Sequence, residues 1–268
     1  MCTLIVGIGT LGPGTLVIGA NRDESPGRAS SGPITLREQP RVVGGRDLVA
    51  GGTWLAIRDA RFVTALLNRR PVPGGPGGPG DPNDPASYRS RGLLCLDAAA
   101  AHSTPDAPHR LDPGTGERHS TRLDAALALF ERDAYAHCTL VGLDVDGEAW
   151  AIHAGHGRPP ETMTLAPGWH VITHADPDDP NEPRTAWLLK RLREVKKAGA
   201  EGTLEAIAAL LRRHEEDGVP AVCLHRDRFP TVSSTILALG NMETPRYLHA
   251  AGPPCVTPYA DVSKLLDS

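Results

Sequence analysis

A cysteine follows Met1, and the run Asn-Arg-Asp-Glu begins 19 positions later, at Asn21. Removal of Met1, which is efficient when the next side chain is small, would leave a thiol and a free α-amine on Cys2. The amine has an unperturbed pKa of about 7.7–8.0 and the thiol one of about 8.5, so a base would stand beside a nucleophile on one residue. The alternative interpretation is a small thiol that is buried like any hydrophobic side chain.

Three further residues could complete an acyl-transfer site around Cys2. Attack on an amide needs a nucleophile, a base and hydrogen-bond donors for the oxyanion. Asp23 could hold or orient the amine, and Arg22 could lower the pKa of the thiol or bind an anionic group on the substrate. Asn68, at the end of an expected strand, could donate to the oxyanion. The competing interpretation is a surface ion pair for Arg22 and Asp23, and a turn residue for Asn68.

The chain around Cys2 is expected to bring these residues together. Apolar side chains alternate from Cys2 to Gly9, a Gly/Pro-rich turn follows, and residues 15–20 form a returning strand. In an antiparallel hairpin of this length, the end of the second strand lies beside the start of the first. We therefore expect Asn21, Arg22 and Asp23 close to Cys2.

The rest of the sequence alternates between strand-like and helix-like patterns. Hairpins come first, helices in the middle and strands again at the end, which predicts an α+β fold with antiparallel sheets covered by helices. We expect one domain over residues 1–268, with a disordered Pro/Gly-rich surface loop at about 71–87. The patterns predict strands at 52–57, 61–68, 138–145, 148–153, 169–174, 221–225, 231–239 and 246–250, and helices at 92–101 and from Thr121, Pro183 and Thr203.

Composition excludes several classes of function. A formal charge of -4 with scattered Lys and Arg gives no basic stripe for nucleic acid. No apolar run approaches the length of a transmembrane helix, and glycines interrupt the apolar start where a signal peptide would be continuous, so we expect a cytoplasmic protein. Five widely spaced cysteines without a CxxC pair indicate neither a disulfide framework nor a zinc site.

The histidines do not form a metal-binding motif along the sequence. His153 and His156 flank a turn, and His170 and His174 would share one face of a strand, but neither pair has a cysteine or carboxylate at ligand spacing. We therefore predict no metal site and no cofactor, with most histidines on the surface or in the core.

Several segments together form a pattern that is more specific than its parts: Met1-Cys2, residues 20–24 with Arg28, residues 44–47 and 51–56, and Leu67-Asn68. This pattern resembles the NRDE family, which includes the transport-and-Golgi-organisation proteins of eukaryotes. The resemblance is strong over residues 1–70 and continues more loosely through His225 and residues 231–235. It implies an αββα sandwich like that of N-terminal nucleophile hydrolases such as the penicillin V acylases and the bile-salt (choloylglycine) hydrolases.

The resemblance also implies roles for individual residues. Cys2 matches the nucleophile, Asp23 the aspartate that contacts the terminal amine, and Asn68 the asparagine at the oxyanion. His174 matches a position that faces the catalytic pocket, and we assign it, with Asn21 and Trp54, to substrate binding.

Three positions depart from the family pattern. The acylases carry an arginine where this chain has Ala20, so Arg22 would serve from a different position. Many NRDE proteins have Ser-Asn where Thr173-His174 stands here, and many have an arginine where this chain has Val232.

Two functions follow from the resemblance. The first is hydrolysis of a non-peptide C–N bond in a small or lipid-like amide, through an acyl-enzyme on Cys2. The alternative is a non-catalytic haem or lipid/acyl-CoA binding and trafficking protein on the same scaffold, which the missing arginines would fit. A regulatory module without a small-molecule pocket would give no reason for Cys2, Asp23 and Asn68 to occur together. Fold alone does not choose between these functions.

Overall fold

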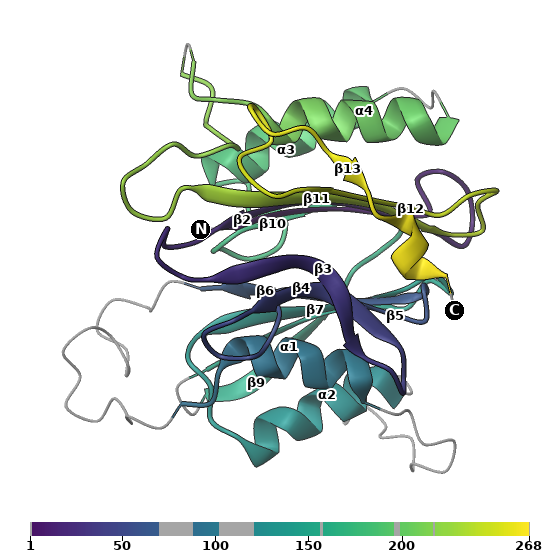
Figure 1. Ribbon diagram of the computed structural model, residues 1–268, viewed down its shortest axis with the longest axis vertical. Coiled ribbons are helices and arrows are strands. Elements are labelled where there is room, and N and C mark those ends of the chain that lie inside the picture. Colours follow the sequence, from purple (N-terminus) through teal and green to yellow (C-terminus); the bar gives the residue numbers. More distant parts are fainter. Residues whose placement is uncertain are drawn as a thin grey trace.

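The computed structural model describes residues 2–69, 88–101, 121–155, 158–195, 199–216 and 218–267. Two antiparallel sheets lie face to face, and helices cover their outer faces (Figure 1). The predicted α+β class and αββα layering are thus confirmed. The Pro/Gly-rich loop predicted at 71–87 lies outside the described residues. None of the described helices is long and apolar enough to cross a membrane.

The described residues form a six-stranded sheet and a seven-stranded sheet. In spatial order, the first contains β10 (Gly168–Ile172), β1 (Thr3–Ile8), β2 (Thr15–Asp23), β11 (Thr231–Gly240), β12 (Arg246–Ala250) and β13 (Ala260–Asp261). The second contains β3 (Ser30–Arg37), β4 (Val42–Asp47), β5 (Leu55–Arg58), β6 (Phe62–Asn68), β7 (Cys138–Asp144), β8 (Ala149–Gly155) and β9 (Arg158–Thr164).

Each sheet carries a pair of helices on its outer face. The helices α3 (Pro183–Glu194) and α4 (Gly199–Leu211) pack on the six-stranded sheet, and α1 (Arg91–Ala100) and α2 (Thr121–Arg132) pack on the seven-stranded one (Figure 1). A short 3-10 helix, η1 (Ser263–Leu266), follows β13. Central strands are therefore buried on both faces, which explains why they read as nearly continuous apolar runs.

The first hairpin forms as predicted and extends further than expected. β1 pairs with β2 in antiparallel register, with Thr3 opposite Asn21, and β2 continues to Asp23. Alternation along β2 then directs Arg22 toward the space between the sheets and Asn21 and Asp23 toward the helices. This division decides what each side chain can contact.

One predicted helix start and one predicted strand are wrong. The helix expected to start at Thr203 begins at Gly199, because the Thr203 hydroxyl donates to the Gly199 carbonyl at 2.9 Å from inside the helix instead of capping it. Residues 221–225 form no strand, because the backbone N–H groups of Val222 and Cys223 both donate to the Arg213 carbonyl at the end of α4. Four strands, β3, β4, β9 and β13, have no counterpart among the predicted elements.

Glycines in β4 allow a large side chain to approach closely. A Cβ added to Gly45 would lie 2.4 Å from the ring of Trp54, so any larger residue would displace the indole. The same ring stacks on Arg22, which links β4 to the end of β2.

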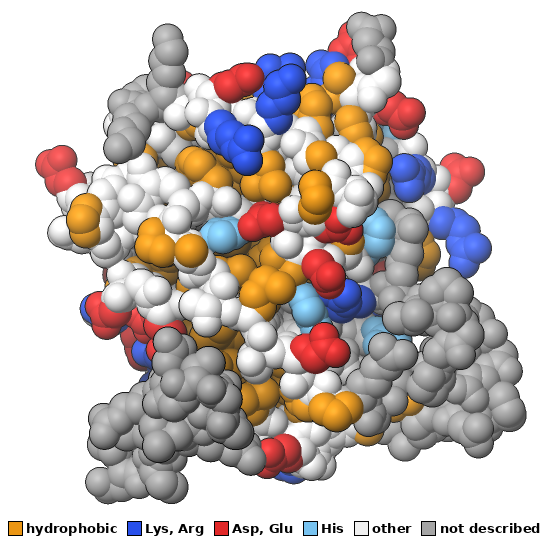
Figure 2. Space-filling model, turned by 180° about the vertical axis from the view of Figure 1, so that it is seen from behind, with side chains coloured by type: hydrophobic (Ala, Val, Ile, Leu, Met, Phe, Trp, Pro, Cys, Tyr) orange, Lys and Arg blue, Asp and Glu red, His pale blue; other side chains and the backbone are white. Residues whose placement is uncertain are grey.

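On the face seen from behind, the residues that the structure describes form no broad basic stripe. In Figure 2, the Lys and Arg side chains that the structure describes are interspersed with acidic ones and with apolar patches. This distribution agrees with the acidic net charge and offers no track for a nucleic-acid backbone on that face.

Candidate active site

Cys2 lies at the entry to β1, at the edge of the core between the two sheets. It is half-buried and packs against that core. Its thiol approaches the Asp23 backbone carbonyl at 3.8 Å, which places it across the hairpin from the end of β2. The predicted proximity of Cys2 to the Asn-Arg-Asp run is therefore confirmed.

A cleft of about 520 Å³ opens in front of the Cys2 side chain. Arg22, Trp54 and Asn68 also line it, so four of the predicted site residues share one cavity. Its remaining wall is strongly charged and includes Glu24, Arg28, Asp47, Arg89 and Arg91. A cavity of this size, with a nucleophile and a few converging polar groups, has the character of a small-molecule site.

A small apolar recess adjoins the cleft on the other side of the thiol. Its volume is about 20 Å³, and its lining includes Leu4, Ala20 and Leu67 together with Cys2. Ala20 thus contributes to an apolar wall at the position where the penicillin V acylases and their relatives carry an arginine.

Arg22 is a buried cation on the inter-sheet side of β2. Its side chain is 5 % exposed, its guanidinium carbon lies 4.1 Å from the centre of the Trp54 ring, and it donates to the Ser30 hydroxyl at 2.9 Å. Burial lowers the pKa of Arg22, while the nearby Glu24 carboxylate raises it. The stacked indole and the Ser30 hydroxyl therefore fix the cation at the cleft wall.

The Asp23 carboxylate points the other way, toward the helices. It accepts a 2.7 Å hydrogen bond from the Thr231 hydroxyl, and the Arg184 guanidinium lies 3.9 Å away. Burial raises the pKa of Asp23, and the Thr231 hydrogen bond and the Arg184 charge lower it. The thiol of Cys2 and the carboxylate of Asp23 therefore flank the beginning of β1 from opposite faces.

The environment of the Cys2 thiol favours its protonated form. Burial raises the pKa of Cys2 most, the Asp23 carboxylate raises it further, and Arg22 acts in the opposite direction. A neutral thiol is a weak nucleophile, so attack from this position needs a base close to the sulfur.

Arg184 is a site residue that the sequence did not reveal. It stands in the first turn of α3, is 6 % exposed, and donates to the Thr3 hydroxyl at 2.8 Å while facing Asp23. The family pattern has an arginine at the position of Val232. In this chain, Arg184 supplies a cation at the site instead. A buried arginine at a helix N-terminus, where the dipole disfavours positive charge, is the one signal that could have identified it.

Val232 occupies an irregular position directly beside the site. The register between β11 and β2 shifts between Thr231, which pairs with Asp23, and Ser233, which pairs with Arg22. Such bulges reorient neighbouring side chains. This one turns the Thr231 hydroxyl toward the Asp23 carboxylate.

The Asn68 side chain is exposed at the end of β6 and faces the cleft. Its backbone pairs with Cys138 of β7, so the strand end is held within the sheet. The next residue, Arg69, is anchored by a 2.6 Å contact with Asp176. Asn68 is thereby placed on the cleft wall, with its amide free to reach a ligand from the seven-stranded sheet.

The structure does not bring Asn21 or His174 into the Cys2 cleft. The Asn21 amide is buried on the helix side, where it donates to the carbonyls of Leu211 and Val222 at 2.9 and 3.0 Å and accepts from Ser234. Because alternation turns it away from Arg22, it joins β2 to the end of α4.

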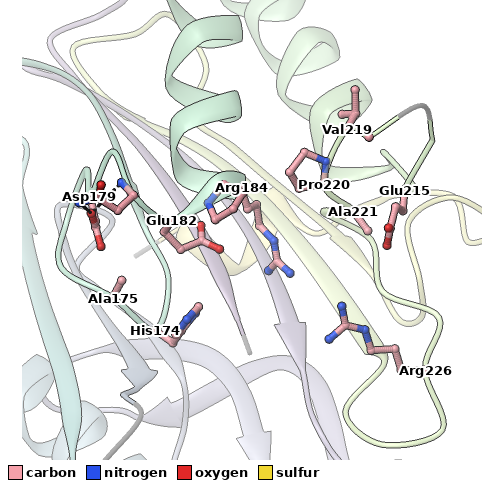
Figure 3. A pocket seen from close by; sticks show the side chains of 13 residues that line it. His174, Ala175, Asp179, Glu182, Arg184, Glu215, Val219, Pro220, Ala221 and Arg226 are labelled. Carbon is pink, nitrogen blue, oxygen red and sulfur yellow. Dashed lines mark hydrogen bonds between the residues drawn. The ribbon is translucent and has the colours of Figure 1, made fainter. Parts of the chain in front are cut away.

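His174 lines a second cleft, of about 580 Å³, on the helix side of β1 (Figure 3). In Figure 3, the side chains of Arg184 and Arg226 extend into this cleft from opposite walls. Glu182 and His174 lie on the Arg184 side, away from Arg226. Arg184 connects the two clefts, because it lines the second one and also contacts Asp23 behind the nucleophile.

The arrangement of layers is that of the N-terminal nucleophile hydrolase fold. The fold matches a Caenorhabditis elegans N-acylethanolamine-hydrolyzing acid amidase ortholog with a TM-score of 0.51 and 13% identity, over 88% of this chain and 92% of the other. It matches penicillin V acylase from Agrobacterium tumefaciens with a TM-score of 0.57 and 11% identity, over 98% and 87% of the two chains. At these identities the likeness establishes the fold.

The particular family is given by the sequence. Residues 1–240 match the family described as Transport and Golgi organisation 2, and the chain belongs to that family. No curated protein matches the chain by sequence.

Proposed function

We propose that the protein is a cysteine N-terminal nucleophile hydrolase that cleaves a non-peptide amide bond through an acyl-enzyme on Cys2. The observation that carries this proposal is the position of the Cys2 thiol, at the boundary of a cleft of about 520 Å³ and beside two buried ionisable side chains, Arg22 and Asp23. A thiol that served only as core filling would not need a cavity in front of it or charges beside it.

The proposed reaction begins with removal of Met1. The free α-amine of Cys2 takes the thiol proton, and the thiolate attacks the amide carbonyl to give a tetrahedral oxyanion, which the Asn68 amide and a backbone N–H stabilise. The ammonium then returns its proton to the leaving nitrogen as the C–N bond breaks and a thioester remains. Water, deprotonated by the same amine, hydrolyses the thioester and regenerates the thiol.

Asp23 and Arg184 act on the amine in this scheme. The carboxylate raises the pKa of the α-ammonium that forms when the thiol loses its proton, and Arg184 keeps the carboxylate ionised in its buried position. Their place on the helix side of β1 leaves the cleft side of the thiol open to the substrate.

The charges around the cleft favour a substrate with an anionic group. Arg91 is a partly buried guanidinium whose Nη1 donates to the His137 backbone carbonyl at 2.9 Å, and burial lowers its pKa. A carboxylate or phosphate on the substrate would stabilise this charge. The small apolar recess beside Cys2 would accept a methyl-sized part of the acyl group.

The test is trapping of the acyl-enzyme. Purified protein is incubated with a panel of N-acyl amides, with and without an acidic substituent, and intact mass reports Met1 removal and acyl adducts. Wild-type protein is expected to show a thioester adduct and amine release, and Cys2→Ala neither. Cys95→Ala, which removes a buried thiol bonded to Thr64 on the helix side of β6, is the matched control and should retain both. Retention of Met1 in active protein would overturn the proposal.

One observation favours a second function. The wall at Ala20 is apolar where the acylases carry an arginine, and an apolar wall beside the cleft of about 520 Å³ suits a bound lipid, acyl-CoA or haem. This second candidate predicts binding of haem or acyl-CoA that is equally tight in Cys2→Ala and unaccompanied by amine release. Loss of such binding in Cys2→Ala would reject it.

A further inference from the structure

A cluster of four soft side chains lies on the helix side of the six-stranded sheet, apart from the Cys2 cleft. It comprises His214, Cys223, His225 and Cys255, each of which offers one ligand atom, and these atoms all lie within 4.8 Å of one another. Cys223 is buried, Cys255 half-buried, and both histidines are exposed, so the cluster is reachable from solvent.

Three segments of the chain converge to form this cluster. His214 follows the end of α4, and Cys223 and His225 belong to the segment that leads toward β11. Cys255 comes from the loop after β12, which passes beside the α4 end in Figure 1, where the Arg212 Nε donates to the Pro254 carbonyl at 3.1 Å. Sequence spacing therefore gives no metal-binding motif, and only the fold brings the four residues together.

The distances among three of the four ligand atoms, the two sulfurs and the His225 nitrogen, fit one tetrahedral ion. With metal–sulfur bonds of about 2.3 Å and metal–nitrogen bonds of about 2.0–2.1 Å, the ligand atoms of a tetrahedral site lie roughly 3.3–3.8 Å apart. The two sulfurs are 3.6 Å apart, and the His225 Nε2 lies 3.8 Å from one sulfur and 3.2 Å from the other. The His214 ring lies edge-on to the His225 ring, with 4.8 Å between centroids.

We propose that His214, Cys223, His225 and Cys255 bind a single Zn²⁺ ion in a tetrahedral Cys₂His₂ site. Two thiolates and two imidazoles are a donor set that prefers zinc over Mg²⁺, Ca²⁺ and Mn²⁺. Binding releases one proton from each thiol, so the bound ion carries two thiolates and two neutral imidazoles and the site is electrically neutral. All four positions are filled by the protein, which is the mark of a structural rather than a catalytic zinc.

The ion would brace the segment that supports the Cys2 site from behind. The carbonyl of Val222, beside the ligand Cys223, accepts from the Asn21 amide, and the N–H of Leu224 donates to the Thr231 hydroxyl at 2.9 Å. That hydroxyl in turn donates to the Asp23 carboxylate. Anchoring the ligands on either side of Leu224 therefore holds Thr231 in place for Asp23.

The first experiment measures metal in the protein as purified. Elemental analysis is expected to find about one zinc per chain, and Co²⁺ exchanged for it should give thiolate-to-cobalt charge transfer with the intense visible bands of a tetrahedral ion. Protein that contains no zinc and gives no tetrahedral Co²⁺ spectrum would overturn the proposal. A disulfide between Cys223 and Cys255 that persists in reductant would also overturn the proposal. It would be seen as a mass lower by two hydrogens.

Variants then assign the ligands. His214→Gln and Cys255→Ser should weaken zinc binding by more than the ~10–100-fold that loss of an outer partner of a metal ligand costs. Cys2→Ser and His170→Gln, which remove a thiol and an imidazole elsewhere, should keep full zinc content. Full zinc in both ligand variants would reject the site. If Cys255→Ser does not fold, the exposed His214 variant and the Co²⁺ spectrum of the wild type still decide the matter.

Discussion

Three of the five cysteines of this protein stand in two unlike surroundings. Cys2 faces a cleft, and its neighbours are two oppositely charged side chains, Arg22 and Asp23, that act on the pKa of its thiol. The sulfurs of Cys223 and Cys255 lie 3.6 Å apart, and a ring nitrogen from each of two imidazoles lies within 4.8 Å of them. A thiol with open space in front of it can attack an electrophile, whereas thiols that converge with imidazoles are a ligand set for a soft metal. The chemistry open to each cysteine is therefore set by the side chains around it.

The two surroundings are mechanically connected through Thr231. Its hydroxyl donates to the Asp23 carboxylate at 2.7 Å and accepts from the N–H of Leu224, between the ligands Cys223 and His225. The cluster can therefore support the cleft without taking part in its chemistry. Changes in the two regions should accordingly separate turnover from metal content.

The largest effect is expected from Cys2→Ala. Removal of the nucleophile should lower kcat/KM for an N-acyl amide by at least about 10³-fold, because Cys2 carries the only thiol among the described residues that line the cleft. Zinc content should stay at the wild-type value. Amine-release kinetics and elemental analysis on the same sample check both. A variant that loses zinc along with turnover would show that the two regions are not separate.

Arg184→Ala is expected to have the next largest effect, on stability. The substitution removes a cation beside the buried Asp23 carboxylate and should cost about 3–5 kcal/mol of unfolding free energy near pH 8. Since Arg184 lowers the pKa of Asp23, its loss raises that pKa, and the deficit should shrink as falling pH protonates the carboxylate. Urea unfolding at several pH values measures this.

Arg191→Ala is the control for Arg184→Ala. It removes an exposed arginine on the same helix that contacts Glu194 at 2.9 Å, and it should change the unfolding free energy by less than about 1 kcal/mol. An equal loss in both variants would mean that helix propensity, rather than the buried ion pair, sets the cost.

The hairpin end of the site could be predicted from sequence, and the remainder could not. Alternation from Cys2 to Gly9 fixes antiparallel geometry, and that geometry places Arg22 and Asp23 beside Cys2 whatever the rest of the chain does. Arg184 and the metal cluster depend on how helices and loops far apart in sequence pack together. Asn21 and His174 illustrate the limit, because each follows a predicted strand pattern but faces the helix side of the sheet.

Gly45→Ala tests the support of the cleft wall. A methyl group at this position would meet the Trp54 ring at 2.4 Å, and the indole would have to move away from Arg22. We expect a loss of about 1–3 kcal/mol in unfolding free energy from overpacking, together with a raised KM, because the displaced ring no longer fixes the Arg22 guanidinium. Zinc content should not change. Gly27→Ala, where an added Cβ meets nothing within 4 Å, is the matched control.

The smallest effect concerns a histidine that pairs with a carboxylate instead of thiols. His170, on β10 beside β1, contacts the Asp178 carboxylate at 2.6 Å, and this hydrogen bond raises the pKa of His170. A raised pKa in the folded state stabilises the protein fully below the unfolded pKa of about 6.5, and the contribution is lost as pH rises through the folded value. His170→Gln should therefore cost about 1 kcal/mol at about pH 5.5 and less at about pH 8.5. A deficit that grows with pH would contradict the pairing. His214→Gln, by contrast, changes a member of the Cys₂His₂ cluster and should show its stability loss only in protein that holds zinc.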